Sequence, residues 1–219
     1  MQHPVEATLS HLKEKLLMMS SYAESAVSQA VRAVTQRNDA LASQVQADDD
    51  IMDQYEVEID EMAIQLLGKS PVDADLRLIT VAMKISQNLE RIGDEATTIA
   101  RRAMELNQDA PLPAQLEIPR MAAIALDMLK DALDCFVNKQ AEKARAIVPR
   151  DKEVDDINRQ IHRDLSRHMA DNPPAIPRCL DLMTVSKSLE RVADHATNIA
   201  QQVVYLCEAQ DIRHKPLPL

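Results

Sequence analysis

The chain has 219 residues, with 25 Lys and Arg against 35 Asp and Glu, and its formal net charge at pH 7 is −10. This charge opposes binding to phosphodiester backbones, and no basic stripe with interleaved aromatic residues offsets it, which argues against a nucleic-acid partner. Two glycines are too few for a glycine-rich phosphate loop or a dinucleotide fingerprint, and 2% aromatic residues are few for a β-sandwich.

The apolar residues and the cysteines indicate in which cellular compartment the chain is expected. No uninterrupted apolar run reaches the roughly 18 residues that suggest a membrane helix. Cys135, Cys179 and Cys207 are odd in number, far apart and in no close pair. This usage favours reduced thiols packed among helices in the cytoplasm over disulfides or a zinc site.

Five breaks rich in proline, glycine or asparagine divide the chain into six predicted helices. The breaks are Asn38 to Asp39, Gly68 to Pro71, Pro111 to Pro119, Asn138 to Lys139, and Asn172 to Pro174. The second helix is expected as one piece over residues 40–67, about 40 Å long at 1.5 Å per residue. Its apolar residues, like those of the third helix, alternate steps of three and four, which predicts faces that pack in a bundle core.

The sequence contains an internal repeat. Residues 86–100 read SQNLERIGDEATTIA and residues 186–200 read SKSLERVADHATNIA, with nine of the fifteen positions identical. Residues 49, 53 and 59 also match residues 151, 155 and 161, at an offset of 102. A tandem duplication with three helices in each copy predicts an all-α fold of two antiparallel three-helix bundles, over residues 1–112 and 113–219, packed together.

Acidic residues recur at four-residue spacing in both copies. In chain order they are Asp49, Asp53, Glu90, Asp94, Asp151, Asp155, Glu190 and Asp194. Each pair shares one face of its helix, and two pairs meet across a groove if the second and third helices of a copy pack antiparallel. Like charges at this spacing destabilise a helix by a few tenths of a kcal/mol each. Bound cations are one compensation, and oxygen ligands suit magnesium, calcium, manganese or iron.

Three alternatives remain beside a metal site. The acids form a solvated face with local ion pairs, Arg91 with Glu95 and Arg191 with Asp194. The long amphipathic helices form a docking scaffold that needs no metal. The third alternative, a carboxylate-bridged metalloenzyme, is disfavoured because ferritin-like sites need a Glu three residues before a His. The residues three before His162, His168 and His195 are Arg159, Leu165 and Val192.

The segment LERIGD at residues 89–94, with DLR at 75–77 and LERVAD at 189–194, resembles the PhoU family of phosphate-uptake regulators. The resemblance covers nearly the whole chain, including QDIRH at residues 210–214. It implies a non-enzymatic protein that links a phosphate ABC transporter ATPase to a sensor histidine kinase and restrains phosphate-starvation signalling. Such a protein is cytoplasmic and reaches the membrane only through its partners, and a homodimer is compatible with this role.

The resemblance also implies a metal site. Some members of the family bind multinuclear clusters through motifs of an acid, three residues and an aspartate, and these motifs fall on the eight acidic positions named above. The expected ions are iron, zinc, manganese or magnesium. In the second copy Asn158 and His162 stand where the first has Glu56 and Asp60. The second site is therefore expected to bind metal more weakly, or to use His162 or His195 as a nitrogen ligand.

Overall fold

The computed structural model describes residues 4–69, 73–112 and 116–213, and this part of the chain is helical without any strand. The first repeat contains α1 (Pro4–Thr35), α2 (Asp39–Ala47), α3 (Asp49–Leu67) and α4 (Asp73–Leu106). The second contains α5 (Ile118–Asn138), α6 (Ala141–Ile147), α7 (Asp151–Asp171) and α8 (Ile176–Glu208), with short 3-10 turns at Val148–Arg150 and Pro173–Ala175. The same order of helices in both halves confirms the predicted all-α tandem repeat.

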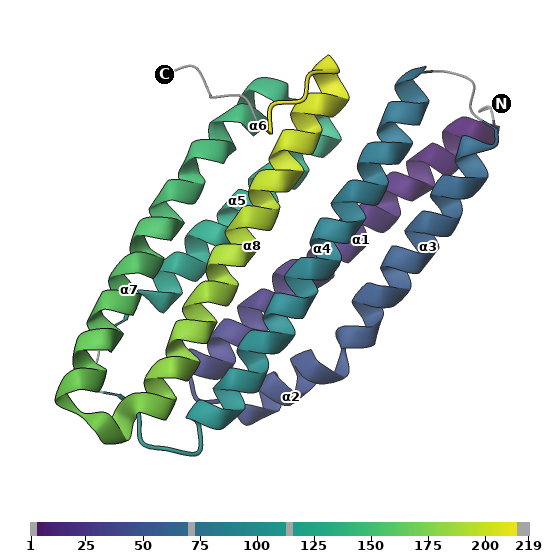
Figure 1. Ribbon diagram of the computed structural model, residues 1–219. Helices are drawn as coiled ribbons and strands as arrows, with labels where there is room; N and C mark the ends of the chain where they lie inside the picture. The colour runs from purple at the N-terminus through teal and green to yellow at the C-terminus, as the bar shows by residue number, and fades with distance from the viewer. Residues whose placement is uncertain (1–3, 70–72, 113–115, 214–219) are drawn as a thin grey trace.

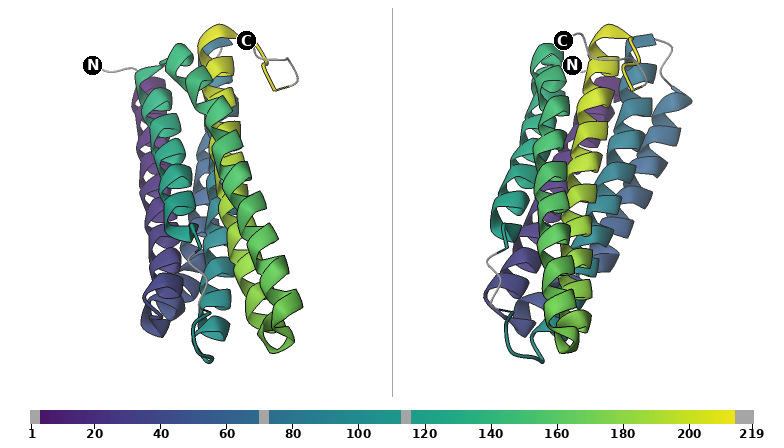
Figure 2. Two further views of the ribbon diagram at one scale, coloured as in Figure 1. Left: turned by 90° about the vertical axis from the view of Figure 1, so that its left-hand side faces the viewer. Right: turned by 60° about the vertical axis from the view of Figure 1, so that its left-hand side comes forward.

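The helices of both repeats lie side by side in one elongated molecule (Figures 1 and 2). Equivalent helices pack on each other, α4 on α8 and α1 on α5. The division of the chain between residues 112 and 113 stays a prediction, because residues 113–115 lie outside the described ranges. Pro71, which was expected to precede the third helix, and His214 also lie outside them.

The prediction of one continuous helix over residues 40–67 is wrong, because α2 ends and α3 begins at Asp48. At Asp48 the backbone leaves regular α-helical geometry, with φ of −92° and ψ of 2°, and the Ile51 N–H donates to the Asp48 carbonyl at 3.1 Å in a tighter, 3-10-type hydrogen bond. The second repeat breaks at the corresponding place, where Pro149 lies in a 3-10 turn. These breaks put Asp49 and Asp151 in the first turns of α3 and α7, where the helix dipole favours negative charge.

Helices α4 and α8 pack against each other and against the long helices of their own repeats. Five equivalent apolar pairs spaced along α4 and α8 are fully buried. The pairs are Ile85 and Val185, Leu89 and Leu189, Ile92 and Val192, Ala96 and Ala196, and Ile99 and Ile199. The stripe predicted for the third helix is therefore confirmed as core, and α8 buries the equivalent residues.

This core predicts equal sensitivity of the two repeats to cavity formation. Leu89→Ala and Leu189→Ala should each lower the free energy of unfolding by about 2–5 kcal/mol, since both remove a fully buried side chain. Leu17→Ala, at a position 40% exposed, should change it by no more than about 0.5 kcal/mol. Urea unfolding followed by circular dichroism measures all three. A large loss in only one of the buried variants would contradict the equivalence.

Candidate functional site

In the first repeat the predicted acids gather in the groove between α3 and α4. Burial and the Asp94 carboxylate raise the pKa of Glu90 to about 7, with smaller contributions from Glu56 and Asp53. Burial also raises the pKa of Asp94, and Asp49 and Asp53 add to that rise. The four predicted positions of this repeat therefore lie close enough to repel one another.

Two neighbours partly compensate the first carboxylate set. Arg91 Nε lies 3.3 Å from Glu90 Oε2, and Arg91 Nη1 lies 3.1 Å from Asp94 Oδ2. Thr97 Oγ1 donates a hydrogen bond of 2.9 Å to Asp49 Oδ1. The first set therefore has a cation and a hydroxyl of its own.

The second repeat assembles the equivalent acids between α7 and α8. The pKa of Asp151 is raised to about 6. Burial is the largest cause, and repulsion from Asp194, Asp155 and Glu190 adds to it. The pKa of Asp194 is raised in the same way, first by burial and then by Glu190. Lys187 forms an ion pair with Glu190, so this set also has local compensation. The predicted convergence of two carboxylate pairs in each half is thus present.

The two sets differ at their threonines. Asp151 Oδ1 and Thr197 Oγ1 are buried and, among the described residues, have no hydrogen-bond partner. Their counterparts in the first repeat, Asp49 and Thr97, bond to each other. Buried polar atoms without partners are costly. The second groove therefore has two oxygen atoms that a ligand could satisfy.

Two substitutions that set the second repeat apart, Asn158 and His195, have structural explanations, and His162 has none. Asn158 is buried and accepts a hydrogen bond from the Ser186 hydroxyl, so it belongs to the core. His195 Nδ1 lies 2.9 Å from Asn88 Oδ1 on α4. This nitrogen serves the contact between repeats and not the second carboxylate set. His162 Nε2 is buried without a hydrogen-bond partner among the described atoms.

The prediction that Arg91 pairs with Glu95 and Arg191 with Asp194 is wrong. Arg91 pairs with Asp94, as described above, and Arg191 Nη1 reaches across to Glu95 Oε1 at 3.0 Å. His195 occupies the position equivalent to Glu95, so the carboxylate that Arg191 meets has no equivalent for Arg91. Because residue 195 is a histidine and not an acid, Arg91 forms its ion pairs with Glu90 and Asp94 of its own helix.

The donor types fit a metal, but the described side chains do not form a finished site. No group of three or more His, Cys, Asp or Glu residues in the described ranges is arranged to hold an ion. The carboxylates lie within repulsion range, and side-chain rotation would be needed to bring their oxygens together. Thr97 and Thr197 were missed by the sequence analysis, although both stand at identical positions of the repeated segment. Within the described ranges, each long helix is interrupted by charged residues and offers no apolar stretch that could span a bilayer.

Fold and grooves together define a class of protein: a duplicated helical bundle with one carboxylate-lined groove in each copy. A family model described as the PhoU domain matches residues 16–103 and again residues 118–203. The chain belongs to the PhoU family.

Relatives and solved structures agree with this assignment. A phosphate-specific transport system accessory protein PhoU homolog of Pseudomonas aeruginosa is 38% identical over 210 residues, covering 95% of this chain and 87% of that protein. PhoU homolog 2 of Thermotoga maritima is 32% identical, covering 92% and 86%. The crystal structure of PhoU from Pseudomonas aeruginosa superposes with a TM-score of 0.90 at 37% identity, covering 94% of this chain and 99% of that one.

The raised pKa of Glu90 predicts a pH-dependent stability. Between the usual pKa of 4.5 and the folded value of about 7, the unfolded chain loses this proton and the folded chain keeps it, so stability falls as pH rises through this window. Glu90→Gln, which stays uncharged, should be more stable than the parent at pH 8 by about 1–2 kcal/mol and gain little at pH 4.

Thermal melts of the metal-free protein at both pH values measure this difference. The matched control is Asp50→Asn, which changes an exposed carboxylate of α3. An equal gain for Glu90→Gln at pH 4 and pH 8 would contradict the assignment of the effect to this proton.

Proposed function

We propose that the chain is a non-enzymatic regulator of phosphate uptake that links a phosphate ABC transporter ATPase to a sensor histidine kinase and restrains phosphate-starvation signalling. The observation that carries the proposal is the pair of PhoU-domain matches, which together span most of a chain whose relatives are accessory proteins of the phosphate-specific transport system. The proposal includes a cytoplasmic location, and a homodimer is compatible with it.

Exposed apolar side chains support a docking role. Val57 and Ile64 are 58% and 64% exposed, and their spacing of seven residues puts them on one face of α3. Leu17 and Met18 of α1, which packs against α3, are also exposed. Apolar surface on a helical face is typical of protein-binding sites. We assign this face to the transporter ATPase.

Co-purification with the cognate ATPase and kinase tests the proposal. The double variant Val57→Ser and Ile64→Ser should weaken capture of the ATPase at least tenfold while the protein still melts cooperatively, because it removes apolar contact area. Val137→Ser, which alters an exposed apolar residue of α5, is the matched control. A deletion strain should express a starvation reporter in phosphate-rich medium. Normal repression in that strain would contradict the regulatory role.

The carboxylate grooves support a second part of the proposal, binding of iron, zinc, manganese or magnesium. Asp49, Asp53, Glu90 and Asp94 would hold ions in the first repeat, and Asp151, Asp155, Glu190 and Asp194 in the second. A bound cation would relieve the repulsion that contributes to the raised pKa of Glu90 and Asp151. It would also satisfy the Asp151 and Thr197 oxygens, which have no hydrogen-bond partner in the described part of the chain. The metal would stabilise the grooves and would not take part in a reaction.

Metal should raise the melting temperature by mass action, adding about 2.7 kcal/mol per site at a hundred times the dissociation constant. Asp94→Asn and Asp194→Asn should each abolish the gain of one repeat. Without metal the same changes should be neutral or slightly stabilising, since burial already disfavours both charges.

Elemental analysis and melts under chelator or added metal measure these effects, with Asp50→Asn as the control. If neither metal nor the two groove variants shift the melts, the metal-free docking scaffold is the correct alternative. Capture of the ATPase is measured in the same buffers, so loss of the metal proposal leaves the docking proposal separately testable.

A further inference from the structure

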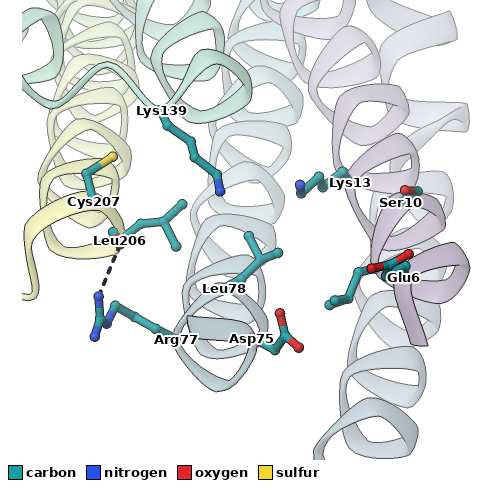
Figure 3. A pocket seen from close by; sticks show the side chains of 10 residues that line it. Glu6, Ser10, Lys13, Asp75, Arg77, Leu78, Lys139, Leu206 and Cys207 are labelled. Atoms are coloured by element: carbon teal, nitrogen blue, oxygen red, sulfur yellow. Dashed lines mark hydrogen bonds between the residues drawn. The ribbon is translucent and has the colours of Figure 1, made fainter. Parts of the chain in front are cut away.

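A cavity of about 550 Å³ lies at one end of the molecule, where both repeats contribute walls. It is lined by residues near the starts of α1 and α4, near the end of α8, and just after α5 (Figure 3). Three of its side chains are cationic, Lys13, Arg77 and Lys139, and Leu78 and Leu206 supply apolar surface. Ligand pockets are typically about 300–1,000 Å³, with mostly apolar walls and a few polar groups.

The repeat shows that Lys139 is unusual. Arg37 and Lys139 are equivalent positions, 102 residues apart, and both adopt left-handed backbone angles, with φ of 54° and 53°. Each is followed by the same helix-ending hydrogen bond, Asn38 N–H to Ala33 O and Gln140 N–H to Cys135 O, both 3.0 Å. The backbone therefore presents a cationic side chain in the same way at the end of the first helix of each copy.

The two cations then find different surroundings. Arg37 donates a hydrogen bond of 2.9 Å to the carbonyl of Asn107 and another to that of Asp109, so its charge rests against the end of α4. The Lys139 ammonium has no hydrogen bond or ion pair with any described residue, and its side chain extends into the cavity (Figure 3). The side chain at this position therefore stabilises the fold in the first repeat, and in the second repeat it is available to a ligand.

Lys13 reaches the same space from α1. Figure 3 shows its side chain and that of Lys139 pointing toward one another, and Lys13 likewise lacks a hydrogen bond or ion pair within the described chain. Two ammonium groups directed into one cavity repel each other unless an anion lies between them. In Figure 3 the carboxylates of Glu6 and Asp75 lie apart from the two ammonium groups. The lysine side of the cavity therefore favours negative charge.

Arg77 also lines the cavity, and its side chain contacts the other repeat. Its Nη1 donates to the carbonyl of Leu206 at 3.5 Å, joining the start of α4 to the end of α8. At the opposite end of the molecule Arg178 donates to the carbonyl of Ala110 at 2.6 Å, joining the start of α8 to the residues after α4. Because both ends have this arginine contact, Arg77 has a structural role. Among the described residues that line the cavity, Lys13 and Lys139 are the cations free to meet a ligand.

We propose that this cavity binds a small organic anion that carries a phosphate or carboxylate group. The anionic group lies between Lys13 and Lys139, and the body of the molecule covers Leu9, Leu78 and Leu206. Phosphate and carboxylate oxygens are the acceptors that lysine ammonium groups bind most strongly. The cavity, of about 550 Å³, is larger than a single inorganic anion and has room for an organic molecule. Because α1 and α4 come from one repeat and α8 from the other, the ligand bridges both.

Calorimetric titration of the full chain tests the proposal, with ATP, citrate and inorganic phosphate as probes, at constant ionic strength and with chelator present. ATP or citrate should bind saturably at one site, more tightly than inorganic phosphate. Lys13→Gln and Lys139→Asn should each weaken that binding about tenfold. Asparagine tolerates the left-handed backbone of residue 139, so this variant keeps the fold. Lys130→Gln, which removes an exposed charge from α5, should bind like the parent.

A second readout is the thiol of Cys207, which lines the cavity and is partly exposed, whereas Cys135 and Cys179 are buried. A bound organic anion should slow alkylation of Cys207, measured by mass spectrometry, and should not slow it in the Lys13→Gln variant. The proposal is overturned if neither ATP nor citrate binds saturably up to 10 mM, a bound well above ordinary ligand affinities. It is equally overturned if Lys130→Gln weakens binding as much as the two cavity variants do.

Discussion

Burial of the equivalent apolar stripes of α4 and α8 is the constraint on which the rest of the molecule depends. Both helices carry the repeated segment, and their apolar residues at equivalent positions are fully buried. Burying this stripe fixes the rotation of each helix about its axis, because side chains four residues apart must share a face. The same rotation directs Glu90 and Asp94 of α4 toward α3, and Glu190 and Asp194 of α8 toward α7. Core packing therefore places the carboxylate grooves.

The duplication did not leave two identical halves, and the differences are electrostatic. Arg191 crosses to Glu95, whereas the position equivalent to Glu95 holds His195, which bonds to Asn88. Arg91 consequently neutralises acids in its own groove, and Arg191 is drawn away from the second groove. In the second groove the Thr197 hydroxyl also lacks a hydrogen-bond partner among the described residues, although the sequence had made this groove the weaker candidate for a metal site. Weaker metal binding by the second repeat was expected because Asn158 replaces an acid. Asn158, however, is buried and hydrogen-bonded to Ser186.

The sequence predicted the fold well because the repeat and the apolar stripes are local signals. It predicted which acids share a groove, since helix spacing and antiparallel packing determine that. The break at Asp48 was missed because no proline or glycine marks it, yet the repeat carried a signal in Pro149. The ion pair between Arg191 and Glu95 could not be predicted, because it joins residues 96 positions apart. The spacing of residues within one helix does not indicate which face of that helix packs against the other repeat.

Arg37 and Lys139 show how duplication separates a structural role from a binding role. Both residues adopt a left-handed backbone that costs about 1–3 kcal/mol for a residue other than glycine, so each helix end must be fixed by its surroundings. The first repeat recovers stability by bonding the guanidinium to carbonyls, which an arginine can do with several donors at once. The second repeat ends its first helix with the same backbone hydrogen bond and leaves a lysine directed into a cavity. An anion there would supply the contact that the carbonyls supply to Arg37, and its binding energy would act on the junction between the repeats.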